Sequence, residues 1–139
     1  MIVATPPCTI AAAQAAVVRQ HPKVEDLAGG PVQVDPNSLE GLVCAGDTMA
    51  VALASGGTAG DVGFVLFRRG ASGWRVVKTG GGYKIGVVKA GADIQIVQPV
   101  YLKNDPNCCP SGGFDRVQYH WNGMRFSVAR SWHTKTFRP

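Results

Sequence analysis

The four cysteines are the residues of this 139-residue chain best suited to covalent chemistry. Cys8, Cys44, Cys108 and Cys109 form an even set without a Cys-x-x-Cys pair, so their spacing fits neither a zinc knuckle nor a thioredoxin-like redox site. Two disulfides account for them instead. Because a trans backbone directs adjacent side chains apart, we expect Cys108 and Cys109 to reach separately to Cys8 and Cys44, in either of two connectivities. Each bridge would close a loop of roughly 65 to 100 residues and stabilise the fold by about 4 kcal/mol.

Three histidines, His21, His120 and His133, are the candidate bases for nucleophilic catalysis. No serine lies in a G-x-S-x-G elbow, and a catalytic cysteine would need a free thiol, which the even cysteine count opposes. We therefore predict that the chain has no catalytic residues. The enzymatic alternative is a small hydrolase that uses His120 or His133, and it requires a deep pocket around one of these rings.

Other chemistries lack the residues that they need. The acidic residues stand singly except for the pair Glu25–Asp26, so no facing carboxylates of the glycosidase type can be identified. The glycine clusters at Gly56–Gly57 and Gly80–Gly82 lack the lysine and hydroxyl residue of a P-loop and predict hairpin turns. A zinc or copper site at Cys108 and Cys109 would need thiolates that disulfides consume. We expect neither a metal nor a cofactor.

Positive charge gathers at the C-terminal end. Between Phe114 and Pro139 the sequence has a single acidic residue, Asp115, and most of the net charge of +5 lies in this segment. Its five cations are Arg116, Arg125, Arg130, Lys135 and Arg138. The aromatic residues among them should be buried by a hairpin, which argues against a nucleic-acid surface. We expect a surface that binds an anionic envelope component or an acidic protein. Its exposed contact residues would be Arg125, Arg130, His133 and Lys135.

These groups would be positioned by a single domain covering residues 1–139. The apolar fraction of 45% supports a packed core, and this length buries about two-thirds of the unfolded surface. An extended arm is expected at 1–9 and a basic tail at 131–139. No apolar run approaches the roughly 18 residues that span a bilayer, so no transmembrane segment is predicted. The N-terminal residues do not have the pattern of a signal peptide, and Pro6 and Pro7 make Cys8 a poor lipid acceptor.

One helix should precede the strands. Thr9 is suited to cap a helix over Ile10–Gln20, with Ile10, Ala13, Ala16 and Val17 on one face and Pro22 preventing its continuation. The stretch from Lys23 to Gly41 is rich in glycine and proline and is expected to form a loop with a short strand at Val32–Val34.

From Leu42 onward the pattern indicates an antiparallel meander. Phe64 and Leu66 alternate with Val65 and Phe67, so their strand should be central and covered on both faces. Pro99 should end or bulge its own run. The expected strands are Thr48–Ala54, Gly63–Arg69, Trp74–Lys78, Tyr83–Lys89 and Ala92–Leu102.

The strongest local pattern is a hairpin over Phe114–Arg130, with Asn122–Gly123 as a two-residue type I′ turn. This loop length predicts one apolar and one polar face. The facing pairs would be Trp121 with Met124, His120 with Arg125, Tyr119 with Phe126, Gln118 with Ser127 and Val117 with Val128.

The loop Val100–Gly113, which contains Asn107-Cys108-Cys109-Pro110-Ser111, and the following strand Val117–Gly123 resemble the C-terminal part of actinobacterial LppP/LprE-type lipoproteins. In such proteins a strand leads into a similar Cys-Cys loop and then into a strand that ends in an aromatic-x-Gly turn. The resemblance, centred on residues 100–123, implies an exported protein of the cell envelope and brings no catalytic residues. This chain departs from the pattern because it lacks a leader and a lipid-acceptor cysteine.

Together these patterns predict an α+β fold in which one N-terminal helix packs on a bent antiparallel sheet of six to eight strands, stapled by disulfides. The predicted function is a non-catalytic binding or interaction module, secreted or associated with the cell envelope. A further alternative is an inhibitor-like protein that presents the disulfide loop 104–113 to a partner, since a rigid exposed loop loses little entropy on binding.

Overall fold

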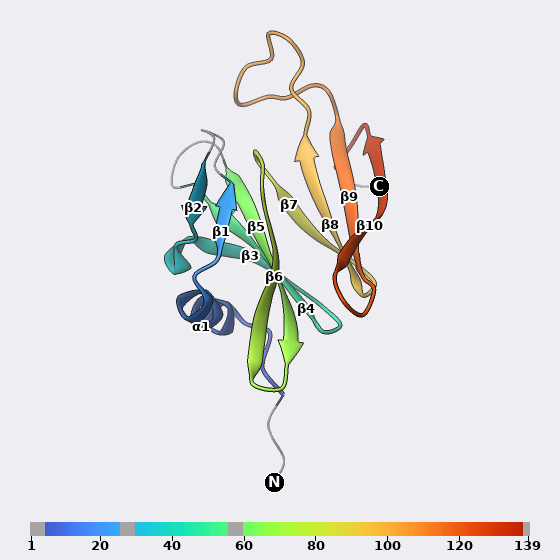
Figure 1. Cartoon of the computed structure of the whole chain (residues 1–139). Helices are drawn as coiled ribbons and strands as arrows, with labels where there is room; N and C mark the ends of the chain where they lie inside the picture. The colour runs from blue at the N-terminus through green and yellow to red at the C-terminus, as the bar shows by residue number, and fades with distance from the viewer. Residues whose placement is uncertain (1–4, 26–29, 56–59, 138–139) are drawn as a thin grey trace.

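A computed structural model describes residues 5–25, 30–55 and 60–137 (Figure 1). Some features predicted from the sequence lie outside these ranges. They are the start of the arm at 1–4, Asp26 of the acidic pair, Gly29 in the first loop, the Gly56–Gly57 turn, and Arg138 at the end of the basic tail.

The described residues form an N-terminal helix followed by antiparallel strands, which confirms the predicted α+β class. The strands are divided between two four-stranded sheets and one two-stranded ribbon. The first sheet has the order β3-β4-β5-β6, the second has the order β10-β9-β8-β7, and β1 pairs with β2. The elements are α1 (Ile10–Gln20), β1 (Lys23–Glu25), β2 (Pro31–Gln33), the short 3₁₀ helix η1 (Pro36–Ser38), β3 (Leu39–Ala45), β4 (Thr48–Ala54), β5 (Asp61–Gly70), β6 (Gly73–Gly81), β7 (Gly86–Ala90), β8 (Asp93–Pro99), β9 (Phe114–Trp121) and β10 (Phe126–Thr134).

The helix has the predicted limits and cap. The hydroxyl of Thr9 accepts a hydrogen bond from the backbone N–H of Ala12 at 3.1 Å, and His21 ends the helix in the left-handed conformation. Three small residues, Ala13, Ala16 and Val17, are buried on one face. Their size allows the helix to lie close to the first sheet.

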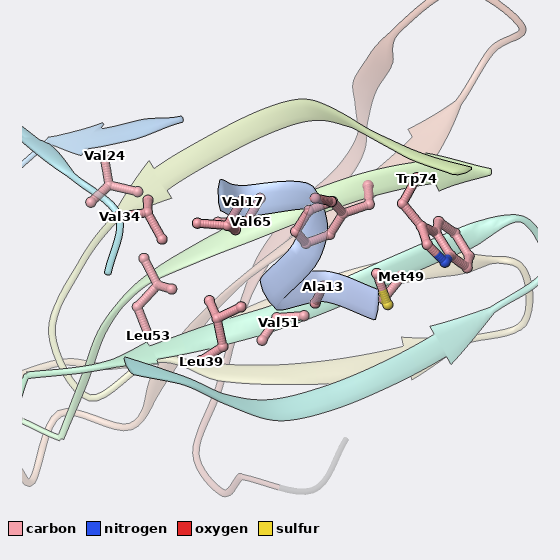
Figure 2. Close-up of a cluster of buried hydrophobic side chains, with 12 residues drawn as sticks. Ala13, Val17, Val24, Val34, Leu39, Met49, Val51, Leu53, Val65 and Trp74 are labelled. Atoms are coloured by element: carbon pink, nitrogen blue, oxygen red, sulfur yellow. The ribbon is translucent and has the colours of Figure 1, made fainter. Parts of the chain in front are cut away.

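A first core fills the space between the helix and the first sheet (Figure 2). Val65 and Phe67 of β5 point into this core, and Trp74 of β6 closes one end of it. Phe64 and Leu66, which alternate with them, point to the opposite face and are also buried. This arrangement confirms that β5 is a central strand covered on both sides.

A second core joins the two sheets. It contains Phe64, Leu66, Ile85, Ile94 and Ile96, together with Ala45 and Ala50. The molecule therefore has three layers, with the helix on one side of the first sheet and the second sheet on the other (Figure 1). Gly80 is required here, because a Cβ at this position would lie 2.4 Å from the ring of Phe64.

Two strands occur where the sequence predicted a loop. β1 lies entirely within the predicted loop Lys23–Gly41, and β3 begins near the end of that loop. The second half of β3 carries Cys44. The pairing of β3 with β4 shifts between Glu40 and Val43, and Gly41 adopts a φ of +62° at this bulge. The bulge interrupts the alternation of apolar and polar residues, so the strand left no regular pattern to detect.

The disulfides differ from the predicted connectivities. Cys8 bonds to Cys44, which ties the N-terminal arm to β3, and Cys108 bonds to Cys109. The expectation that each adjacent cysteine bridges to a distant partner was wrong. The reason is the tertiary placement: the Cys-Cys loop extends beyond the ends of β8 and β9, whereas Cys8 and Cys44 lie beside the helix and the first sheet (Figure 1).

Candidate binding surface

All four residues predicted to form a contact surface lie on or beside β10, an edge strand of the second sheet. Arg125 belongs to the turn before the strand, Arg130 and His133 lie within it, and Lys135 follows it. All four are exposed. Because β10 continues to Thr134, the segment predicted as a tail begins with strand residues.

The hairpin between β9 and β10 exists, but its predicted turn and register were wrong. Trp121 pairs with Phe126, so the loop has four residues, 122–125, instead of two. The side chain of Asn122 explains the longer loop, because its oxygen accepts hydrogen bonds from the N–H groups of Met124 at 2.9 Å and Arg125 at 3.1 Å. Arg125 consequently lies at the end of this loop, next to β10, instead of opposite His120.

A bulge decides where Arg130 points. The register of β10 against β9 shifts between Val128 and Arg130, so that Arg130 pairs with Gln118 and Trp132 pairs with Arg116. Paired residues share a face of the sheet, and this is the outer face, away from the second core. The guanidinium of Arg130 lies 4.0 Å from the centre of the Trp132 ring, a cation–π contact that fixes the charge on this face.

Both histidines of the hairpin are paired with carboxylates. His120 Nδ1 lies 2.8 Å from Asp93, and His133 Nδ1 lies 2.9 Å from Asp115. Half of each imidazole is exposed, at 54% for His120 and 48% for His133. The hydroxyl of Ser127 donates to the backbone carbonyl of His120 rather than to its ring. A hydrolase that uses either histidine stays a prediction from the sequence.

A chain of hydrogen bonds crosses the outer face of the second sheet. Arg116 donates to Gln95 at 3.4 Å, Gln95 donates to Gln118 at 3.1 Å, and Gln118 donates to Asp93 at 2.7 Å. The direction of the chain is set by its ends, because the guanidinium only donates and the carboxylate only accepts. The two amides therefore have fixed orientations between a cation and an anion.

Arg116 is the buried end of this chain and is only 1% exposed. It donates to the hydroxyl of Thr134 at 3.0 Å and to the carbonyl of Thr136 at 3.5 Å, and the ring of Phe137 lies 5.7 Å away. No ion pair in the described ranges involves Arg116. The segment after β10 thus covers this cation, whereas Arg125, Arg130 and Lys135 leave their charges exposed.

The sequence predicts one polar face for the hairpin, with Gln118 and His120 on it. It does not predict that this face continues through Gln95 and Asp93 of β8 or that Arg116 is buried at its end. A usable signal was present, because polar residues alternate with core residues on both strands, as at Gln95 between Ile94 and Ile96.

Two aromatic residues of the hairpin turn toward the second core. Tyr119 and Phe126 pack against the second core, and burial raises the pKa of the Tyr119 hydroxyl. Trp121 is half-buried, with the guanidinium of Arg68 4.8 Å from its ring centre.

The Cys-Cys loop is held by two polar hubs. Asp105 accepts hydrogen bonds from the N–H groups of Leu102 and Ser111 and from the Ser111 hydroxyl, at 2.7 to 3.0 Å. These hydrogen bonds lower the pKa of the Asp105 carboxyl. The bond from the Ser111 hydroxyl has the largest effect, and the bonds from the two backbone N–H groups add to it.

Asn107 is the second hub of this loop. Its carbonyl accepts hydrogen bonds from Lys84 and from the Tyr101 hydroxyl, each at 2.7 Å, and its side chain contacts the Tyr83 hydroxyl. The loop is therefore joined to the segment between β6 and β7. An inhibitor-like role for residues 104–113 stays a prediction.

Comparison of the chain with protein-family models, with curated proteins and with solved structures found no match. No helix among the described residues is long and apolar enough to cross a membrane. Within the same part of the chain, no three potential metal ligands gather in one place.

Proposed function

We propose that this protein is a non-catalytic binding module that works outside the cytoplasm and uses the β10 edge to bind an elongated anionic partner. The two disulfides support an oxidising and therefore extracytoplasmic setting. The sequence resemblance to actinobacterial LppP/LprE-type lipoproteins supports the cell envelope as the location. An anionic envelope polymer or an acidic protein of the envelope would be the partner.

The observation that carries the proposal is the row of exposed cations along one strand. Arg125 directly precedes β10, Arg130 lies at its middle and Lys135 directly follows it, and none of them takes part in an ion pair with a described residue. A nine-residue strand is about 30 Å long. Charges spaced over that length fit a partner with repeated negative groups better than a small anion.

His133 contributes less to this surface than expected. Its ring is paired with Asp115, so the carboxylate offsets the charge that a protonated imidazole would add. Arg130 contributes more, because Trp132 holds its guanidinium in place and reduces the entropy lost on binding.

The test is retention on isolated cell envelope of an actinobacterium, measured by sedimentation at low and high salt. We expect Arg125→Glu combined with Arg130→Glu to abolish retention while the circular dichroism spectrum and Tm stay unchanged. The control is Lys23→Glu combined with Lys89→Glu, which makes the same change in net charge at two exposed cations of other strands. The control should be retained, and wild-type retention should fall as salt rises. Equal retention of both variants, or equal loss, would overturn the proposal.

A further inference from the structure

We propose that Cys108–Cys109 is a site of thiol–disulfide exchange, which an external thiol opens and closes while the protein stays folded. This inference concerns the loop beyond β8 and β9 and does not depend on the anion-binding surface along β10. The partner would be a small thiol or a protein dithiol in the compartment where the chain resides.

The positions of the two disulfides in the chain separate their roles. Cys8 and Cys44 are 36 residues apart, and their bond fastens the N-terminal arm to β3. Cys108 and Cys109 are neighbours, so their bond joins no two elements of the fold. Opening it releases no segment, and the entropy that it removes from the unfolded chain is minimal.

The surroundings of the pair also favour exchange. Cys108 and Cys109 are both exposed. In the other disulfide only Cys44 is exposed, and Cys8 is half-buried and packs against the first core. An attacking thiolate must reach a sulfur atom along the line of the bond, so exposure of both residues allows attack from either side.

The loop that carries the pair does not depend on the disulfide for its shape. Asp105 closes the loop through Leu102 and Ser111, and Asn107 is held by Lys84 and Tyr101. These contacts involve neither cysteine side chain. Two backbone hydrogen bonds of 2.9 Å close the base of the loop, from Val100 to Gly113 and from Gly112 to Val100. We therefore expect the loop to keep its place when the bond opens.

The exchange is a two-electron reaction. A thiolate of the partner attacks one sulfur, forms a mixed disulfide and displaces the other cysteine as a thiolate, which takes up a proton. A second thiol of the partner then attacks the mixed disulfide. The partner leaves as a disulfide, and Cys108 and Cys109 become two free thiols. The exposed tip of the loop thereby changes from a closed disulfide to a dithiol that can bind thiophilic reagents.

The experiment treats the folded full chain with increasing dithiothreitol, traps free thiols with iodoacetamide and locates them by peptide mass. We expect Cys108 and Cys109 to be alkylated while Cys8–Cys44 stays intact and the Tm and circular dichroism spectrum are unchanged. After removal of the reductant, the opened chain should bind one phenylarsine oxide, a reagent for paired thiols, and oxidised glutathione should restore the bond.

The control is Cys108→Ala combined with Cys109→Ala, which should take up neither iodoacetamide nor phenylarsine oxide under the same conditions. Three results would overturn the proposal. They are resistance of both disulfides until denaturant is added, opening of Cys8–Cys44 before the adjacent pair, and loss of the native spectrum as the adjacent pair opens.

Discussion

Replacing Cys8 and Cys44 with alanine should lower the free energy of unfolding by about 4 kcal/mol. The bond closes a loop between cysteines 36 residues apart, and the chain-entropy relation gives this value for a loop of that length. A domain of this size is stable by only about 5–15 kcal/mol, so the loss is a large fraction of the total. The arm would then rely on hydrogen bonds from Trp74 to Pro7 at 2.8 Å and from Arg69 to Pro6 at 3.2 Å.

The matched variant replaces Cys108 and Cys109 with alanine. It removes the same two sulfur atoms, but from a bond between neighbouring residues that encloses no intervening residue. The same relation assigns it about 1 kcal/mol or less. Urea denaturation of wild type and both double variants, followed by circular dichroism, measures the two losses at equal protein concentration.

The comparison has a clear refutation. If the two double variants lose equal stability, or if the Cys108 and Cys109 variant loses more, then loop closure does not govern how these bonds stabilise the fold. If removal of Cys8–Cys44 instead costs well under 1 kcal/mol, the remaining contacts of the arm hold it without the bond.

Two further predictions concern ionisable groups. The pKa of Asp61 is raised to about 6 in the folded protein. Burial of the carboxyl is the largest cause, and a hydrogen bond with Glu40 and charge repulsion from it add to the effect. Protonation is therefore favoured by folding, and stability should fall as the pH rises through about 6, by about 1 kcal/mol once solvent screening is included. Asp61→Asn should flatten this pH profile in urea titrations from pH 4 to 8, and an unchanged profile would contradict the assignment. Arg116→Ala should cost about 2–3 kcal/mol, because it leaves the oxygens of Gln95 and Thr134 without their donor, whereas Arg125→Ala should stay within about 0.5 kcal/mol. Equal losses for the two arginine variants in thermal unfolding would show that burial of Arg116 is not important.

Local patterns were sufficient for much of the first layer. Thr9 and Pro22 bracket the helix because capping and the missing proline donor act within a few residues. The limits of β4 followed from alternation, and the double burial of β5 followed from its continuous apolar run. In each case the deciding interaction repeats with the period of the element, so it is visible in the order of the residues.

The hairpin shows where local rules stop. Asn122–Gly123 favours a two-residue turn, but the Asn122 side chain binds the N–H groups of the next residues and lengthens the loop. The bulge before Arg130 then shifts the register a second time. Competing local hydrogen bonds of similar energy lead to different registers, and the packing of the whole second sheet selects one of them.

The sequence by itself determined the α+β class, the helix, the central strands and the excess of cations near the C-terminus, because these depend on composition and short periods. Only the tertiary structure decided which cysteines bond, which cations are exposed and which one is buried. Cys8 meets Cys44 across a separation of 36 residues, and the segment after β10 folds back to cover Arg116. Such contacts depend on how the layers stack, and no local pattern of residues encodes that arrangement.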